Sequence, residues 1–136
     1  MARIIESTKG GTAFQRLLGH NEGILERWTK LGDMLEREGR LSSHLKEQVR
    51  RTLAQENGCE YCKAKGKPDP YTFNEKISVA VGFAEVFNKQ KGNIPDSIFA
   101  MLSQHFTDEE ISELFAFITF ATASQYFGAL MKLQAN

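Results

Sequence analysis

The sequence predicts an all-α fold, and three observations carry this prediction. Apolar residues recur every three or four positions through most of the chain, which is the spacing of one helix face. Residues that typically begin or end helices stand between these stretches. The alternating apolar and polar pattern of strands does not appear. We expect about six helices in a single domain, residues 21–136, preceded by a loosely held N-terminal arm, residues 1–20.

Two helices are expected in the first half of the domain. Asn21 is a suitable N-cap for the first helix, which Gly39 ends. Its apolar face consists of Ile24, Trp28, Leu31 and Leu35. Ser42 is the expected N-cap of the second helix, which ends at the Asn-Gly pair, residues 57–58. Its apolar face consists of Leu45, Val49 and Leu53.

Three further helices are expected in the second half, after a loop at residues 67–70 that contains two prolines. The first covers residues 73–92 and the next covers residues 95–106. The last covers residues 108–133 and begins with a capping box, in which Thr107 and Glu110 exchange hydrogen bonds. This last helix is apolar nearly all round, so it must be covered on most sides. A chain of 136 residues covers it poorly, and we therefore expect a homo-oligomer.

Composition and charge limit the classes of function. Seventeen Lys and Arg residues balance 17 Asp and Glu residues, so the net charge gives no reason to expect binding to nucleic acid or to an acidic membrane. The N-terminus lacks the apolar region of a signal peptide, and no apolar run is long enough to span a bilayer. These features predict a cytoplasmic protein, in which a cysteine pair is more often catalytic or metal-binding than a structural link.

The only two cysteines, Cys59 and Cys62, form a C-E-Y-C motif at residues 59–62. At this spacing on a helical turn both sulfurs lie on one face, close enough to form a disulfide. Gly58 indicates that a helix begins here, and a helix start lowers a thiol pKa and favours the thiolate. One thiolate attacks an oxidised substrate, and the other cysteine resolves the product as a disulfide. The motif therefore predicts a thiol oxidoreductase without a metal or other cofactor.

Other interpretations of the cysteine pair remain open. A structural zinc site needs four ligands, but His20, His44 and His105 are scattered through the chain without ligand spacing. Two ordinary buried cysteines at this spacing are a second alternative. A thioredoxin-type motif requires a strand before the helix, and no strand is expected.

Thiol chemistry also needs a proton acceptor, and Glu47 is the best-placed carboxylate in the sequence. It lies twelve residues before Cys59, on a helix face that continues through Ala54 to Gly58 below the motif. The alternative is an exposed surface glutamate, which is common where lysine and glutamine flank the residue.

The stretch from His20 to Cys62 resembles the carboxymuconolactone decarboxylase superfamily, and within it the AhpD-like alkylhydroperoxidases. The similar segments there are L-G-D at residues 31–33, G-R-L-S at 39–42, L-K-E at 45–47 and N-G-C-E-Y-C at 57–62. The C-terminal segment F-T-D-E-E-I-S-E-L at 106–114 also resembles the family, so the similarity covers roughly residues 20–130. The resemblance implies an AhpD-like helical bundle assembled as a trimer or hexamer. It also implies reduction of a hydroperoxide or exchange of a disulfide, with a thiol or dithiol as electron donor. By resemblance, Cys62 is the nucleophile, Cys59 its partner and Glu47 part of a proton relay.

The sequence departs from this family at the relay group. AhpD-like proteins carry a histidine four residues after the second cysteine, where this chain has Gly66. Since imidazole is the side chain best suited to proton transfer near neutral pH, thiol–disulfide exchange is a safer prediction than peroxidase activity. His20, His44 and the hydroxyl of Tyr61 are possible replacements. Two alternative functions stay open: a lactone decarboxylase-like lyase, and a non-enzymatic redox sensor that assembles as an oligomer.

Overall fold

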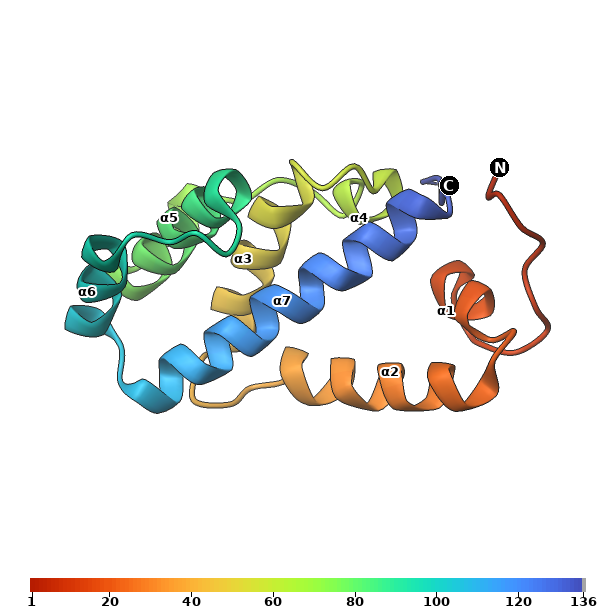
Figure 1. Cartoon of the computed structure of the whole chain (residues 1–136), viewed down its shortest axis with the longest axis horizontal. Helices are drawn as coiled ribbons and strands as arrows, with labels where there is room; N and C mark the ends of the chain where they lie inside the picture. The colour runs from red at the N-terminus through yellow and green to blue at the C-terminus, as the bar shows by residue number, and fades with distance from the viewer. Residues whose placement is uncertain (136) are drawn as a thin grey trace.

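The computed structural model describes residues 1–135, which form helices and loops without a strand, so the all-α prediction is confirmed (Figure 1). The elements are α1 (Ala13–Leu18), α2 (Glu22–Glu36), α3 (Ser43–Ala54), α4 (Glu60–Lys63), the 3₁₀ turn η1 (Pro70–Thr72), α5 (Glu75–Gln90), α6 (Asp96–His105) and α7 (Asp108–Leu130). There are thus seven α-helices in these residues, and α1 is the one that the sequence did not predict.

The helix starts follow local sequence signals closely. The Ser42 hydroxyl accepts a hydrogen bond from the Leu45 N–H at 3.0 Å, as expected for an N-cap. Thr107 and Glu110 form the predicted capping box, with bonds of 2.9 and 3.2 Å. Asn21 occupies the N-cap position of α2, but its side chain makes no capping hydrogen bond.

Helix ends depart more from the prediction. α2 ends at Glu36 rather than near Gly39, and α7 ends at Leu130 rather than at residue 133. After α2, a buried lysine binds the chain outside the helix: Lys46 donates to the Arg37 carbonyl at 2.8 Å and pairs with Glu113 at 3.0 Å. The end of α2 is thus fixed by a tertiary contact, whereas α7 is closed locally, by a hydrogen bond from the Leu133 N–H to the Gly128 carbonyl at 3.0 Å.

The main core lies around α3, which packs against α5 and α7, with α6 closing one end (Figure 1). Its centre is fully buried and apolar. Among its larger side chains, those with the least exposure are Val49, Leu53, Leu102, Leu114 and Ile118. Burial of these groups is the main apolar contribution to stability in this half of the molecule.

The N-terminal segment is more ordered than a loose arm. Thr12 and Gln15 form a capping box at the start of α1, and Leu17 and Leu18 are buried. The Arg3 N–H donates to the Met131 carbonyl at 2.8 Å, which joins the two ends of the chain. Tertiary contacts order this segment: α1 packs against α2, and the ring centres of Phe14 and of Phe127 on α7 are 5.3 Å apart. The boundary between an arm and a domain at residues 20 and 21 stays a prediction.

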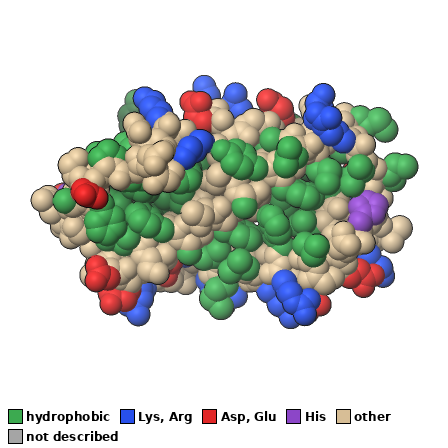
Figure 2. Space-filling model, in the orientation of Figure 1, with side chains coloured by type: hydrophobic (Ala, Val, Ile, Leu, Met, Phe, Trp, Pro, Cys, Tyr) green, Lys and Arg blue, Asp and Glu red, His purple; other side chains and the backbone are tan. Residues whose placement is uncertain are grey.

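Several large apolar side chains remain exposed on the surface. They include Ile24, Leu31 and Met34 on α2, and Tyr126 and Leu130 on α7. Figure 2 shows hydrophobic side chains gathered in patches across the face on which α7 lies. The apolar face predicted for residues 24–35 is thus only partly covered: α2 packs against α1, α3 and α7, yet Ile24 and Leu31 stay exposed. None of the helices in residues 1–135 combines the length and apolar character needed to cross a bilayer.

Candidate thiol site

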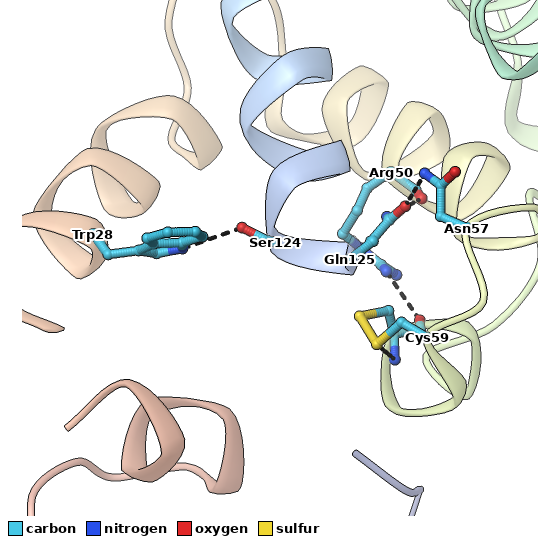
Figure 3. The surroundings of a disulfide bond; sticks show 7 residues. Trp28, Arg50, Asn57, Cys59, Ser124 and Gln125 are labelled. Carbon is cyan, nitrogen blue, oxygen red and sulfur yellow. Dashed lines mark hydrogen bonds between the residues drawn. A yellow bond between two sulfur atoms is a disulfide. The ribbon is translucent and has the colours of Figure 1, made fainter. Parts of the chain in front are cut away.

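The cysteine pair lies at the turn between α3 and α4. Gly58 has a φ of 78°, a left-handed conformation that suits glycine, and it turns the chain into the new helix. Cys59 is the N-cap of α4 and Cys62 follows one turn later, with 5.2 Å between the Cα atoms. The two sulfurs form a disulfide (Figure 3). The predicted disulfide geometry and helix start are therefore confirmed.

The two sulfurs lie in different surroundings. Cys59 is 1% exposed, and its Sγ accepts a hydrogen bond from the Cys62 N–H at 3.2 Å. Cys62 is 8% exposed and lies in the wall of a cavity. Behind the pair, α7 passes so close that a Cβ added at Gly128 would collide with Cys59 Sγ. Gly128 was not singled out from the sequence, because a glycine inside an apolar helix gives no local signal of what it contacts.

The cavity measures about 290 Å³ and lies among α1, α2, α4 and α7. Its apolar wall is formed by the side chains Phe14, Leu18, Trp28, Phe117 and Phe120. Polar side chains also line it, among them Glu36, Arg50, Lys65 and Gln125. A mostly apolar pocket with a few convergent polar groups is typical of a small-molecule site.

Glu47 lies near the pair but is bound by two arginines. Its carboxylate accepts from Arg50 at 2.7 and 2.9 Å and from Arg51 at 2.8 Å. Burial opposes ionisation, but the hydrogen bonds from Arg50 and Arg51 outweigh it and lower the pKa of Glu47 to about 2. Arg50 also donates to the Cys62 carbonyl at 3.1 Å. Glu47 therefore reaches the cysteine motif through Arg50, and the sequence signal for this was its spacing of three and four residues from the arginines.

A second carboxyl, Glu36, shares the cavity with Cys62 and was missed by sequence reasoning. It also lines an adjoining polar cavity together with Arg50 and Lys65. Burial of its carboxyl raises the pKa of Glu36, Lys65 opposes this rise, and the neighbouring Asp33 adds to it. The residue as a whole stays exposed, so water attenuates the effect. Burial and the charge of Arg50 lower the pKa of Lys65.

A chain of amide hydrogen bonds connects α7 to the site (Figure 3). Asn57 Nδ2 donates to Gln125 Oε1 at 2.8 Å, and Gln125 Nε2 donates to the Arg50 carbonyl at 3.2 Å. Asn57 and Gln125 are 5% and 2% exposed, so these bonds are shielded from water. They hold α3, the turn before Cys59 and α7 in fixed positions.

Gly66 follows α4 with a φ of 116°. A side chain at this position would be strained, since this conformation is rare for residues with a Cβ. The backbone here thus differs from a helix that continues past the motif, and it favours glycine over the relay histidine of AhpD-like proteins.

The three candidate replacements for the relay histidine lie in different places. Tyr61 lines the cavity, and the Lys65 ammonium lies 5.3 Å from its ring centre. His44 lines the adjoining polar cavity with Glu47, and its Nε2 is 2.9 Å from Thr72 Oγ1. His20 lines neither cavity, and its Nε2 lies 2.6 Å from the Ile5 carbonyl oxygen. The roles of all three stay predictions.

Within residues 1–135, no group of three or more His, Cys, Asp or Glu side chains is placed to hold a metal ion. A scan against models of protein families finds no match for this chain, and no curated protein matches it. The similarity to the carboxymuconolactone decarboxylase superfamily therefore stays a resemblance of motifs.

Proposed function

We propose that this chain is a thiol oxidoreductase that uses Cys62 and Cys59 to reduce an organic hydroperoxide or a disulfide. One observation carries the proposal: in a buried disulfide-forming pair, Cys59 is 1% exposed, whereas Cys62 is 8% exposed and lies in the wall of a cavity of about 290 Å³. A purely structural link does not require such a cavity. The resemblance to AhpD-like proteins supports the same assignment of roles.

The reaction follows from the different surroundings of the two sulfurs. The Cys62 thiolate attacks the terminal oxygen of a hydroperoxide, the O–O bond breaks, and the leaving alkoxide takes a proton to become an alcohol. Cys62 is oxidised to a sulfenic acid. The Cys59 thiol then attacks the Cys62 sulfur, which forms the disulfide and releases water. A dithiol donor restores both thiols and is itself oxidised to a disulfide.

Two cysteine variants test the proposal. Cys62→Ser should abolish dithiothreitol-dependent consumption of cumene hydroperoxide and of a small disulfide. Cys59→Ser should stop turnover after one event and leave a sulfenic acid or mixed disulfide on Cys62, which mass spectrometry of the intact protein detects. If wild-type protein consumes neither substrate with any dithiol donor, the proposed activity is wrong.

Glu47 keeps its proposed place in the proton relay, but its contacts favour a positioning role. A carboxylate with a pKa of about 2 is a weak base, whereas its bonds to Arg50 fix a guanidinium that contacts the Cys62 carbonyl. Glu47→Gln separates the two roles. Loss of a positioning contact changes KM and kcat together, whereas loss of a base changes the pH dependence of kcat.

A second candidate is a non-enzymatic redox sensor, which Gly66 favours because its backbone conformation disfavours the relay histidine. Titration of the reduced protein with iodoacetamide distinguishes the candidates. A Cys62 pKa near the free value of about 8.5 supports the sensor, and a lowered value supports the enzyme.

We also propose that the chain works as a homo-oligomer, a trimer or hexamer, in the cytoplasm. The exposed apolar side chains of α2 and α7 support this, because such groups commonly mark contact surfaces. Light scattering at several protein concentrations tests it. A mass of 15.3 kDa at every concentration contradicts it.

A further inference from the structure

We propose that Glu36 exchanges the catalytic proton at Cys62, in place of the histidine that Gly66 excludes. The proposal rests on the function proposed above. Its basis is geometric: Cys62 and Glu36 line one cavity, from α4 and from the last turn of α2. A substrate bound in this cavity would therefore be lined by both residues.

Glu36 also has a path to bulk water. It lines the adjoining polar cavity as well as the one that contains Cys62, and the residue is exposed overall. A proton carrier needs both contacts, because it must recover or release a proton to solvent after each turnover. Glu47 lines only the polar cavity, where two arginines hold its carboxylate ionised.

The charges around Glu36 come from three elements. Asp33 precedes it by one turn on α2, Arg50 and Glu47 face it from α3, and Lys65 faces it from the segment after α4. Burial and the two acidic neighbours favour the protonated carboxyl, while the two cations favour the carboxylate. Glu36 is therefore better suited than Glu47 to change its protonation state during turnover.

The proton balance is complete within the site. The Glu36 carboxylate takes the proton of the Cys62 thiol, and the resulting thiolate attacks the hydroperoxide. As the O–O bond breaks, the Glu36 carboxylic acid returns the same proton to the leaving alkoxide. The net change is oxidation of the Cys62 thiol to a sulfenic acid and reduction of the hydroperoxide to an alcohol, with Glu36 unchanged.

Glu36→Gln tests this with two readouts on reduced protein. The first is the pH profile of kcat for cumene hydroperoxide with dithiothreitol. The kcat of wild type should fall at acidic pH as Glu36 is protonated. The variant should lack this acidic limb of the pH profile, and its kcat should be about 10²-fold lower. The second is the pH dependence of Cys62 alkylation by iodoacetamide in a Cys59→Ser background. Removal of a nearby negative charge should move its midpoint to lower pH.

The two readouts together exclude a merely structural effect. The expected signature is a larger thiolate fraction of Cys62 at a given pH together with a lower kcat. A disturbed site would instead lower both the thiolate fraction and kcat. Glu26→Gln is the matched control, since Glu26 lies on α2, is exposed and pairs only with Lys30 at the surface. It should match wild type in both readouts.

Other results overturn the inference. If Glu36→Gln keeps the wild-type rate and acidic limb, Glu36 does not transfer the proton, although the cysteine chemistry stands. If Asp33→Asn or Lys65→Met removes the limb instead, another group carries the proton. If wild-type protein turns over neither a hydroperoxide nor a disulfide, the proposed function fails together with this inference.

Discussion

The two halves of the molecule are held together by different forces. In the half made by α3, α5, α6 and the start of α7, buried apolar side chains form one large cluster. In the half made by α1, α2, α4 and the end of α7, the buried apolar cluster around the cysteines has three members, Ala54, Cys59 and Cys62. The remaining links there are contacts between partly exposed aromatic rings, such as Phe14 with Phe127 and Trp28 with Phe120, and hydrogen bonds such as those of Gln125.

Under the proposed function, this difference leaves room for a substrate. A close-packed core leaves no space for a substrate, whereas the weakly filled half contains the cavity of about 290 Å³ beside Cys62. Hydrogen bonds such as the pair made by Gln125 position the site without filling it. Substitutions in the two halves should therefore differ in what they change: global stability in the first, and local geometry of the thiols in the second.

The largest effect on stability is expected for Leu114→Ala. Leu114 is 0% exposed in the core half, so the substitution leaves a cavity and should cost about 2–5 kcal/mol in the free energy of unfolding. Leu130→Ala removes the same atoms from the other end of α7, where the residue is 74% exposed, and should cost less than about 0.5 kcal/mol in the monomer. Urea unfolding measures both. Equal costs would contradict the division into two halves.

The next effect is expected at the contact between α7 and the disulfide. Gly128→Ala places a methyl group against Cys59 Sγ and should lower the free energy of unfolding by about 1–3 kcal/mol. It should also change the alkylation rate of the reduced thiols. Gly82→Ala is the matched control inside α5, where an added Cβ has no neighbour within 4 Å. It should stabilise the protein by about 0.5–1 kcal/mol. Destabilisation of similar size at both glycines would indicate a general helix effect instead.

Gln125→Leu should lower the free energy of unfolding by about 1–3 kcal/mol. It leaves the buried Asn57 amide and the Arg50 carbonyl without the hydrogen bonds that Gln125 makes to them. A double-mutant cycle with Asn57→Leu sharpens the measurement. The two costs should be less than additive, since each variant already breaks the shared hydrogen bond. Strict additivity would show that the amide chain does not act as a unit.

The smallest effect concerns acid stability. The pKa of Glu47 lies at about 2 in the folded protein, below its ordinary value of 4.5. Its ion pairs therefore stabilise the fold above about pH 4.5, and this contribution is lost as the pH falls towards about 2. The side chain is 38% exposed, so solvent limits the contribution to about 1 kcal/mol or less. The unfolding free energy of Glu47→Gln should depend less on pH in this range than that of wild type or Glu26→Gln.

Helix starts and the cysteine geometry were predictable because they depend on neighbouring residues. The Ser42 cap, the Thr107–Glu110 capping box and the disulfide spacing of Cys59 and Cys62 each involve groups three residues apart. Glu47 was found by its distance along the chain from Cys59, and the arginines that bind it stand three and four residues further on.

The cavity and the surroundings of the thiols could not be predicted in this way. Gly128 contacts the cysteines, Gln125 binds Asn57 just before them, and Glu36 lines the same cavity as Cys62. All three lie on helices that are distant from the motif in sequence, so no local pattern marks them. Lys46 beside Glu47 has the sequence context of a surface residue, yet it is 2% exposed and paired with Glu113 on α7. Burial depends on which helices pack together.

The sequence by itself therefore determined the all-α class, the helix starts and the redox-capable spacing of Cys59 and Cys62. Hydrogen bonds and periodicity over a single turn are enough to specify these features. Only the tertiary structure decided that Cys62 faces a cavity, that Cys59 is covered by Gly128, and which carboxyls stand nearby. These depend on the packing of α7 against the rest of the chain, which brings together residues more than sixty positions apart.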